Sequence, residues 1–287
     1  MDDLTNEEII SLLDDAESLL PVANGDNYLP LLQGKLLANM FFEPSTRTRM
    51  SFETAMKRLG GDVVNLGDVK SSSAVKGETL YDTMRMVDGY CDIAVLRHPQ
   101  QGAAQYAGDA CSISIMNGGD GAGHHPTQTL LDLFTIRQAF GKLDGLKVAL
   151  VGDLRYGRTV HSLSHALSRF NCELIFISPA QLSMPAEIVN DLSENGATIT
   201  VSENLYECIP EVDVIYMTRI QKERFPDEDE YAKVAGIYRL TADDLSGAKG
   251  EMIILHPLPR VDEIHPDVDS TRHARYFEQT FNNIITH

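Results

Sequence analysis

Three hydroxyl side chains and two guanidinium groups lie within five residues, in the segment Ser45-Thr46-Arg47-Thr48-Arg49. The preceding residues 35–42 are mostly apolar and have the length of a buried strand. After the cluster, apolar residues return at helical spacing until Gly60-Gly61. This pattern predicts a strand, a turn and a helix, with Ser45 or Thr46 at the helix cap. Such a turn suits an anion, because free N–H groups, hydroxyls and arginine forks all donate hydrogen bonds.

An ordinary helix cap with surface arginines is the simpler interpretation of this cluster alone. Further cations follow predicted strands or lie in loops of a chain whose net charge is −18, namely Lys76, Arg97, Arg158 and Arg219. A single cation of this kind is ordinarily solvated or paired at the surface, and it contributes little to stability. Together with Arg47 they fit substrates that carry several negative charges. The 45–48 turn and Arg97 suit a phosphate, whereas Arg158 and Arg219, in the second half of the chain, suit carboxylates.

Two other patterns resemble cofactor or metal sites but do not have the required spacing. Gly152 and Gly157 are five positions apart, but the spacing is not that of a dinucleotide-binding loop. His124 and His125 have no third ligand at a useful spacing, so we expect no metal site. His125 is better placed to donate a hydrogen bond that polarises a carbonyl group. We expect neither a metal nor another cofactor.

Strands and helices alternate along most of the chain. Strands are predicted at 35–42, 63–66, 93–97, 111–116, 147–151, 174–178, 198–201, 214–217 and 252–255. Helices are predicted at 9–20, 46–59, 78–89, 101–107, 129–140, 158–170 and 186–195, the first with a capping box at Thr5-Asn6-Glu7-Glu8 and a stop at Pro21. Residues 117–123 are expected to form a flexible loop that delivers His125. The alternation predicts an α/β protein of two domains, each a mainly parallel sheet with helices on both faces. The join falls within 129–145, and ligands are expected at the carboxyl ends of the strands.

Composition limits the class of protein. The chain has 287 residues, 43% of them hydrophobic, which is enough for two domains with proper cores. The net charge argues against nucleic acid and anionic membranes as partners. No apolar run approaches a membrane span, the first residues show no signal-peptide pattern, and the four cysteines are scattered. We therefore expect a cytoplasmic protein.

Seven motifs together resemble the aspartate/ornithine carbamoyltransferase family over nearly the whole chain. They are Phe42-Glu43-Pro44-Ser45-Thr46-Arg47-Thr48-Arg49, Lys76-Gly77-Glu78-Thr79, Arg97-His98-Pro99-Gln100, His125-Pro126-Thr127-Gln128, Gly152-Asp153-Leu154-Arg155-Tyr156-Gly157-Arg158-Thr159-Val160-His161, Thr218-Arg219-Ile220-Gln221 and His256-Pro257-Leu258-Pro259-Arg260. The aspartate branch fits best. That resemblance implies transfer of the carbamoyl group of carbamoyl phosphate to the amine of L-aspartate, an early step of de novo pyrimidine biosynthesis.

The resemblance also implies roles for particular residues. The phosphate would be held by Ser45, Thr46, Arg47, Thr48 and Arg97. The carbamoyl oxygen would be surrounded by Thr48, Arg97 and His125, and its amino group would meet Gln128. The aspartate carboxylates would be held by Arg158, Arg219 and Gln221, with Leu258 and Pro259 near the amine. The resemblance assigns catalysis itself to Arg47, Thr48, Arg97 and His125.

The organisation implied by the resemblance is a homotrimer. Ser72 and Lys76 would enter the site of a neighbouring subunit, and Glu43 would pair with Arg158 when the site closes. Residues 1–135 would bind carbamoyl phosphate and residues 136–287 would bind aspartate. A separate zinc-bearing regulatory chain accompanies some relatives. Two departures are that Asn283 replaces a usual glycine and that a further apolar helix expected after it is missing or short.

Two alternatives remain. Ornithine carbamoyltransferase shares the 45–48 turn, but its cationic substrate typically meets a His-Cys-Leu-Pro motif, where this chain has Pro257. A non-catalytic sensor or assembly protein on the same fold is the other alternative. The intact set Arg47, Arg97, His125, Arg158 and Arg219 argues against it, and measured turnover separates the two.

Overall fold

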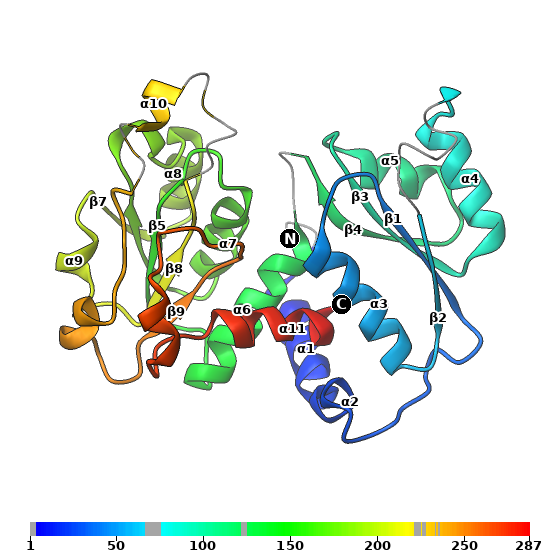
Figure 1. Ribbon diagram of the computed structural model, residues 1–287, viewed down its shortest axis with the longest axis horizontal. Helices are drawn as coiled ribbons and strands as arrows, with labels where there is room; N and C mark the ends of the chain where they lie inside the picture. Colours follow the sequence, from blue (N-terminus) through cyan, green and yellow to red (C-terminus); the bar gives the residue numbers. More distant parts are fainter. Residues whose placement is uncertain are drawn as a thin grey trace. The chain divides into compact units, whose positions relative to one another are not determined.

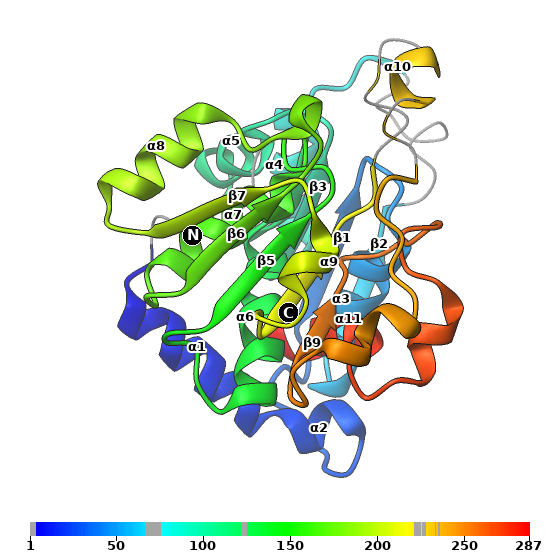
Figure 2. The ribbon, with the colours of Figure 1, turned by 90° about the vertical axis from the view of Figure 1, so that its left-hand side faces the viewer.

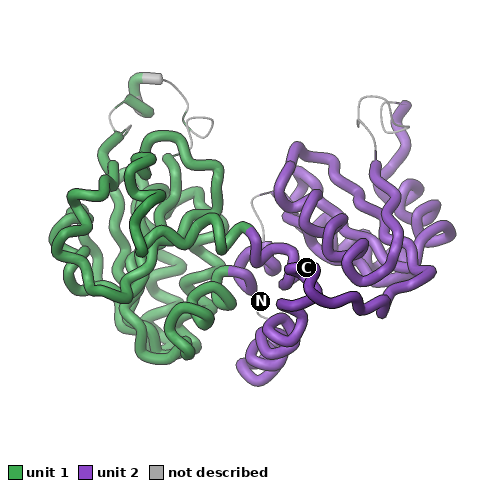
Figure 3. The backbone as a smooth tube through the Cα atoms, turned by 60° about the horizontal axis from the view of Figure 1, so that its bottom comes forward, with its two compact units in different colours: residues 1, 132–280 green, residues 2–131, 281–287 purple. Residues whose placement is uncertain are grey.

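The computed structural model describes residues 4–66, 76–121, 125–220, 225, 228–232, 234 and 236–287 (Figure 1). The chain forms two compact units (Figure 3). The N-terminal unit comprises residues 2–131 and 281–287, and the C-terminal unit comprises residues 132–280. Each unit is built on one parallel sheet, which confirms the predicted α/β class with two domains. No helix in the described part of the chain is long and apolar enough to cross a membrane.

The sheet of the N-terminal unit has the order β2-β1-β3-β4, and all its described pairs are parallel. Its strands are β1 (Leu36–Phe41), β2 (Asp62–Asn65), β3 (Ile93–His98) and β4 (Ser114–Asp120). Its helices are α1 (Asn6–Ser18), α2 (Leu20–Asn24), α3 (Thr46–Arg58), α4 (Leu80–Tyr90) and α5 (Ala103–Ala110).

Alternation along β1 decides which helix covers which face of this sheet. Leu37 and Phe41 pack with Phe52 and Met56 of α3. Ala38 and Met40 point to the other face because successive side chains of a strand alternate. There they join a cluster that includes residues of α4 and α5, namely Met84, Val87, Ala103 and Ala107. Helices therefore cover both faces, with α3 on one face and α4 and α5 on the other.

The sheet of the C-terminal unit has the order β7-β6-β5-β8-β9, again with parallel pairs (Figure 2). Its strands are β5 (Lys147–Val151), β6 (Glu173–Ile177), β7 (Thr198–Ser202), β8 (Val214–Met217) and β9 (Ile253–Leu255). Its helices are α7 (Arg158–Ser168), α8 (Ala186–Glu194), α9 (Leu205–Cys208) and α10 (Glu228–Ala232), with 3₁₀ turns at Ala180–Leu182, Asp243–Gly247 and Pro266–Ser270.

Two helices contain residues of both units. They are α6 (Pro126–Phe140), which includes residue 131, and α11 (Tyr276–Thr286), which includes residue 280. In the C-terminal unit, Asp132 of α6 accepts hydrogen bonds from Tyr216 Oη at 2.8 Å and from Gln279 Nε2 at 2.6 Å. All three side chains are fully or almost fully buried. Asp132 therefore ties α6, β8 and α11 together within this unit.

Some predicted element boundaries are wrong. The loop expected at 117–123 is strand as far as Asp120, because β4 continues its parallel pairing with β3 to Asp120 opposite His98. Gly118 permits this, since a Cβ there would lie 3.0 Å from Val95 Cγ1. Pro21 does not end the first helix, which already ends at Ser18; it lies in the first turn of α2, where a missing N–H costs nothing. The capping box at Thr5 and Glu8 is confirmed.

Candidate active site

The predicted anion turn lies at the carboxyl end of β1, where α3 begins. Ser45 occupies the cap position with extended backbone, but its hydroxyl makes no capping hydrogen bond. The first turn of α3 contains Arg47 and Arg49 and no acidic residue. Partial burial of the guanidinium lowers the pKa of Arg47, although the residue as a whole is exposed and remains a cation. Ser45 thus occupies the predicted cap position without capping the helix through its side chain, and its hydroxyl remains available to an anion.

Arg97 lies beside this turn because β1 and β3 are neighbours and Phe41 pairs with Arg97 in the ladder. Its Nη1 donates to the carbonyl of Gly118 at 3.0 Å, and its Nε lies 3.7 Å from Glu43 Oε2. The side chain is only 15% exposed, so the strand neighbours fix its position. In the N-terminal unit, therefore, Glu43 lies against Arg97. The expected Glu43–Arg158 pair joins residues of different units and stays a prediction.

His125 lies at the start of α6, where its carbonyl accepts from the amides of Gln128 and Thr129. The residue is 7% exposed. Its Nδ1 lies 3.4 Å from Thr127 Oγ1, and that hydroxyl lies 2.9 Å from His287 Nε2. The fold therefore holds His125 through a threonine and through a histidine at the other end of the sequence. The sequence analysis assigned neither residue a role, since no local pattern links Thr127 to His287.

In the C-terminal unit, the loops after β5 and β8 pack closely and are joined by hydrogen bonds. Gly152 has φ +111°, and a Cβ there would lie 2.3 Å from the carbonyl oxygen of Thr218. Thr218 Oγ1 donates to Val151 O at 2.9 Å and accepts from the amide of Asp153 at 3.1 Å. Only glycine permits such close approach of two loops. Because Arg219 follows Thr218, this contact fixes the start of the loop that carries it.

Arg158 is the first residue of α7 and follows Gly157, as the sequence predicts. The loop before it is held by His161, whose Nε2 donates to the carbonyl of Leu154 at 2.7 Å. Burial lowers the pKa of His161, so the ring is neutral near pH 7 and serves as a structural donor. A helix that begins with an arginine is suited to an anion through both its dipole end and the guanidinium.

A cavity of about 230 Å³ lies in the C-terminal unit beside Arg219. The residues that give it its chemistry are Thr218, Arg219, Tyr231, Tyr238, Asp262 and Glu263. Burial raises the pKa of Tyr238 to about 12, so this phenol stays neutral, and it donates to the carbonyl of Glu203 at 3.1 Å. The cavity thus combines one guanidinium with aromatic walls and two carboxyl groups.

The loop after β9 carries Leu258 and Pro259, which are joined by a cis peptide bond. Leu258 has φ +51°, a conformation that is uncommon for a bulky side chain. Its amide donates to His256 Nδ1 at 2.8 Å, and His256 Nε2 donates to Glu263 Oε1 at 2.6 Å. Burial alone would raise the pKa of Glu263, but hydrogen bonds from His256 and from backbone amides outweigh it and lower that pKa.

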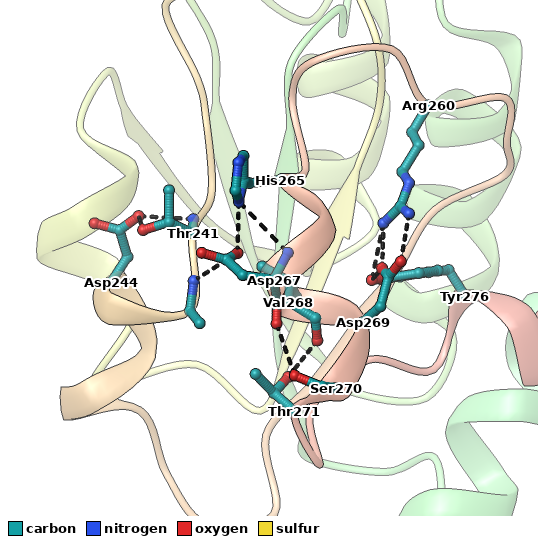
Figure 4. A network of polar contacts seen from close by, with 11 residues as sticks. Thr241, Asp244, Arg260, His265, Asp267, Val268, Asp269, Ser270, Thr271 and Tyr276 are labelled. Atoms are coloured by element: carbon teal, nitrogen blue, oxygen red, sulfur yellow. Dashed lines mark hydrogen bonds and ion pairs between the residues drawn. The ribbon is translucent and has the colours of Figure 1, made fainter.

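The segment that follows this loop is held by a polar network around Asp269 (Figure 4). Asp269 accepts from both terminal nitrogens of Arg260 and from the hydroxyl of Tyr276, and the guanidinium lies 5.2 Å from the centre of the Tyr276 ring. Nearby, the side chain of His265 accepts from the amide of Asp267 at the start of a 3₁₀ turn. Arg260 therefore has a structural role, and its contacts hold the end of the loop that follows Pro259.

The predicted site residues fall into two groups, each described within its own unit. Ser45, Thr46, Arg47, Thr48, Arg97, His125 and Gln128 belong to the N-terminal unit, and Arg158, Arg219, Leu258 and Pro259 belong to the C-terminal unit. Lys76 is exposed just before α4. The predicted sites Ser72 and Gln221 lie outside the described residues. Among the described residues, no group of three or more His, Cys, Asp or Glu side chains is arranged to hold a metal ion.

Two family models match almost the entire chain. The model described as the carbamoyl-P binding domain of aspartate/ornithine carbamoyltransferase matches residues 1–138. The model described as the Asp/Orn binding domain of the same family matches residues 144–287.

Individual relatives agree with these models. The aspartate carbamoyltransferase catalytic subunit of Archaeoglobus fulgidus is 58% identical over 282 residues, which are 98% of this chain and 93% of the relative. The solved catalytic subunit of M. jannaschii aspartate transcarbamoylase is similar with a TM-score of 0.94 at 52% identity, over 100% of this chain and 93% of that one. Aspartate transcarbamoylase from Trypanosoma cruzi, solved in complex with carbamoyl phosphate and aspartate, is similar with a TM-score of 0.93 at 40% identity, over 99% and 92% of the two chains.

Proposed function

Because this chain belongs to the aspartate/ornithine carbamoyltransferase family, we propose that it carries out the aspartate reaction of that family. It transfers the carbamoyl group of carbamoyl phosphate to the amine of L-aspartate, giving N-carbamoyl-L-aspartate and phosphate. The similar chains are named for aspartate, and one of them was solved with both substrates. The observation that carries the proposal is the open, cationic start of α3 beside Arg97.

The phosphate half of the site is proposed to lie in the N-terminal unit. Ser45, Thr46, Arg47 and Thr48 offer hydroxyls, a guanidinium and free N–H groups to the phosphate, and Arg97 adds a second guanidinium. This is support from geometry: the Ser45 hydroxyl is not used to cap the helix, and Arg97 is fixed beside the turn by its strand.

The reacting carbonyl is proposed to lie against Thr48, Arg97 and His125. Attack by the amine places negative charge on the carbamoyl oxygen, and fixed donors around it lower the barrier as an oxyanion hole does. Gln128, one helical turn from His125, accepts from the carbamoyl amino group. The C–O bond to phosphate then breaks, phosphate leaves with its bonding electrons, and the amine gives up a proton. Departing phosphate is the nearest base for that proton.

The aspartate half is proposed to lie in the C-terminal unit. Arg158 at the start of α7 and Arg219 beside the 230 Å³ cavity bind the two carboxylates, with Gln221 assisting. Leu258 and Pro259 contribute carbonyl and wall contacts near the amine. Two arginines suit the two carboxylates of aspartate better than the cationic side chain of ornithine.

Assembly into a homotrimer with shared sites is also proposed, with Ser72 and Lys76 serving a neighbouring subunit. What supports it in this chain is an exposed apolar surface on α4 and α5. Tyr81, Met86, Tyr90 and Tyr106 are 44–72% exposed, and Tyr81 and Tyr106 contact each other edge to face. Surfaces of this kind commonly become buried between subunits. A separate regulatory chain is proposed as a further partner, since the relatives are named as catalytic subunits.

The direct test is turnover of the purified chain with carbamoyl phosphate and either L-aspartate or L-ornithine. We expect N-carbamoyl-L-aspartate to form and ornithine to be inert. Turnover of ornithine without aspartate would move the chain to the other branch of the family. Absence of turnover with both amines in a folded trimer would favour a sensor or assembly role.

A further inference from the structure

The side chain of His287 contacts two helices, α3 and α6, within the N-terminal unit. Its ring stacks on Phe52 of α3 with 3.8 Å between ring centres and 2° between ring planes. Its Nδ1 lies 2.8 Å from Ser51 Oγ of α3, and its Nε2 lies 2.9 Å from Thr127 Oγ1 in the first turn of α6. One face and both nitrogens of the ring are therefore engaged, so the ring has a defined orientation.

This contact continues to the proposed catalytic histidine. Thr127 Oγ1 also lies 3.4 Å from His125 Nδ1, which is a long hydrogen bond but within reach. Ser51, His287, Thr127 and His125 thus form one connected series of polar contacts. The series runs from α3, the helix that begins at the 45–48 turn, to His125, which donates to the carbamoyl oxygen in the proposed function.

Hydrogen counting couples the two imidazoles. Burial lowers the pKa of His287 to about 3, so near neutral pH one ring nitrogen donates and the other accepts. The Thr127 hydroxyl has a single hydrogen. If His287 donates through Nε2, that hydrogen goes to His125 Nδ1, and neutral His125 carries its own hydrogen on Nε2. If His287 accepts at Nε2, His125 must donate through Nδ1, and its Nε2 has no hydrogen.

The Ser51 hydroxyl has two partners within hydrogen-bond distance, so its contacts permit either sense. One is His287 Nδ1, and the other is the carbonyl of Thr48 at 2.9 Å. Thr48 lies inside α3, where the helix already supplies its carbonyl with an amide partner. The Ser51 hydrogen can therefore be given to His287 without leaving that carbonyl unpaired.

We propose that His287 is a positioning residue for His125, which it holds through Thr127 in the tautomer that carries hydrogen on Nε2. This inference rests on the proposed function, in which His125 donates to the carbamoyl oxygen. A neutral imidazole can donate from Nε2 only if Nδ1 carries no hydrogen, and Thr127 favours this tautomer by donating its hydroxyl hydrogen to Nδ1. The direction of the hydrogens is then Ser51 to His287, His287 to Thr127 and Thr127 to His125.

The first test compares His287→Phe with His287→Gln. Phenylalanine keeps a flat ring on Phe52 but removes both nitrogens, whereas glutamine retains an amide that can donate to Thr127. We expect kcat to fall about tenfold in His287→Phe. A loss of this size is typical when a residue that orients a metal-bound histidine by a hydrogen bond is removed. The KM of either substrate should change little, and His287→Gln should recover part of kcat. An unchanged kcat in His287→Phe would overturn the proposal.

The second test asks whether the effect passes through Thr127 and His125. In a Thr127→Val or a His125→Ala background, adding His287→Phe should cause no further loss of kcat, because the contact that it would disrupt is already gone. The same tenfold loss in either background would mean that His287 acts through the fold, and the proposal would be wrong. Normal turnover in His125→Ala alone would instead contradict the proposed role of His125 itself.

The third test reads the tautomer without using activity. In protein with ¹⁵N-labelled histidines, the His125 signals are assigned by their loss in His125→Ala. We expect His125 to carry hydrogen on Nε2 in the wild-type chain and to become a mixture of tautomers in His287→Phe. Hydrogen on Nδ1 of wild-type His125 would refute the stated direction, even in a fully active enzyme.

Discussion

His256 Nε2 lies 2.6 Å from Glu263 Oε1, and the two side chains are 1% and 7% exposed. The other nitrogen of the same ring accepts from the amide of Leu258 at 2.8 Å, so His256 is neutral and its hydrogen is on Nε2. Because Leu258 has φ +51°, its backbone conformation costs free energy and needs support from its surroundings. The His256–Glu263 pair supplies that support to the loop that carries Leu258 and Pro259.

Glu263→Ala should therefore impair aspartate binding. Loss of the carboxylate leaves a buried histidine donor without a partner, which costs about 1–3 kcal/mol of stability, and it loosens the Leu258 loop. We expect a higher KM for L-aspartate with little change in the KM for carbamoyl phosphate. Glu263→Gln should restore much of the loss, since an amide oxygen also accepts from His256.

The matched control for Glu263→Ala is Glu211→Ala. Glu211 is 67% exposed and pairs with Lys147 on the surface, so its loss should change stability by less than about 0.5 kcal/mol. Equal effects of the two substitutions on the aspartate KM would contradict a specific role for the His256–Glu263 pair.

Acid should weaken the fold through His287. The pKa of this ring is about 3 in the folded chain, below its ordinary value of 6.5, so the unfolded chain binds more protons between these values. The free energy of unfolding should fall as pH drops below about 6.5, by at most about 1.4 kcal/mol per pH unit from this group. In His287→Phe that contribution is absent.

Urea unfolding of wild type and His287→Phe at a series of pH values between about 5 and 7 measures the difference in slope. This range lies above the ordinary pKa of most carboxyl groups, so the histidine dominates the comparison. Identical slopes for the two chains would show that the ring is not held neutral by the fold.

Arg219→Ala and Arg47→Ala should separate the two halves of the proposed site. Arg219 lies beside a cavity of the C-terminal unit, whereas Arg47 lies in the first turn of α3. We expect Arg219→Ala to raise the aspartate KM while the binding of carbamoyl phosphate stays nearly normal. Arg47→Ala should instead remove most turnover, because a lost charge-assisted contact to a desolvated anion costs about 2–5 kcal/mol. Steady-state kinetics with each substrate varied in turn measures both.

If Arg219→Ala weakened both substrates equally, the division of labour between the units would be wrong. Near-normal turnover of Arg47→Ala at saturating carbamoyl phosphate, with unchanged affinity, would remove Arg47 from the phosphate site. Arg272→Ala offers a control in the C-terminal unit, since it removes a guanidinium that is not among the proposed ligands.

Shared sites in a trimer predict complementation between two inactive chains. Lys76→Ala and Arg47→Ala should each be nearly inactive alone. If Lys76 serves a neighbour's site, mixed trimers contain some sites that receive both intact groups, and turnover should reappear. The measurement is activity after subunit exchange, with mixed trimers confirmed by mass. No recovery at any mixing ratio would show that each chain completes its own site.

The strands and the anion turn could be predicted from the sequence because their signals are local. Residues 147–151 and 214–217 are short apolar runs, and both strands begin and end where predicted. The end of β4 could not be predicted, because Asn117, Gly118 and Gly119 resemble a loop and only pairing with β3 makes them strand.

The supporting contacts of the site were not predictable for a related reason. His287 and Thr127 are 160 positions apart, and His256 and Glu263 meet only because the intervening loop turns back. No spacing rule links such pairs. The sequence therefore predicts candidate substrate-binding residues, whereas the partners that orient them are seen only in the fold.

The N-terminal unit is discontinuous in sequence, since residues 281–287 belong to it although the whole of 132–280 intervenes. The ribosome makes α3 early in synthesis. The ring that stacks on Phe52 belongs to His287, which is made 235 positions later. The C-terminal unit can finish its sheet before that moment. The unit that is translated first is thus the last to complete its packing, and until then the Phe52 ring lacks the imidazole that stacks on it.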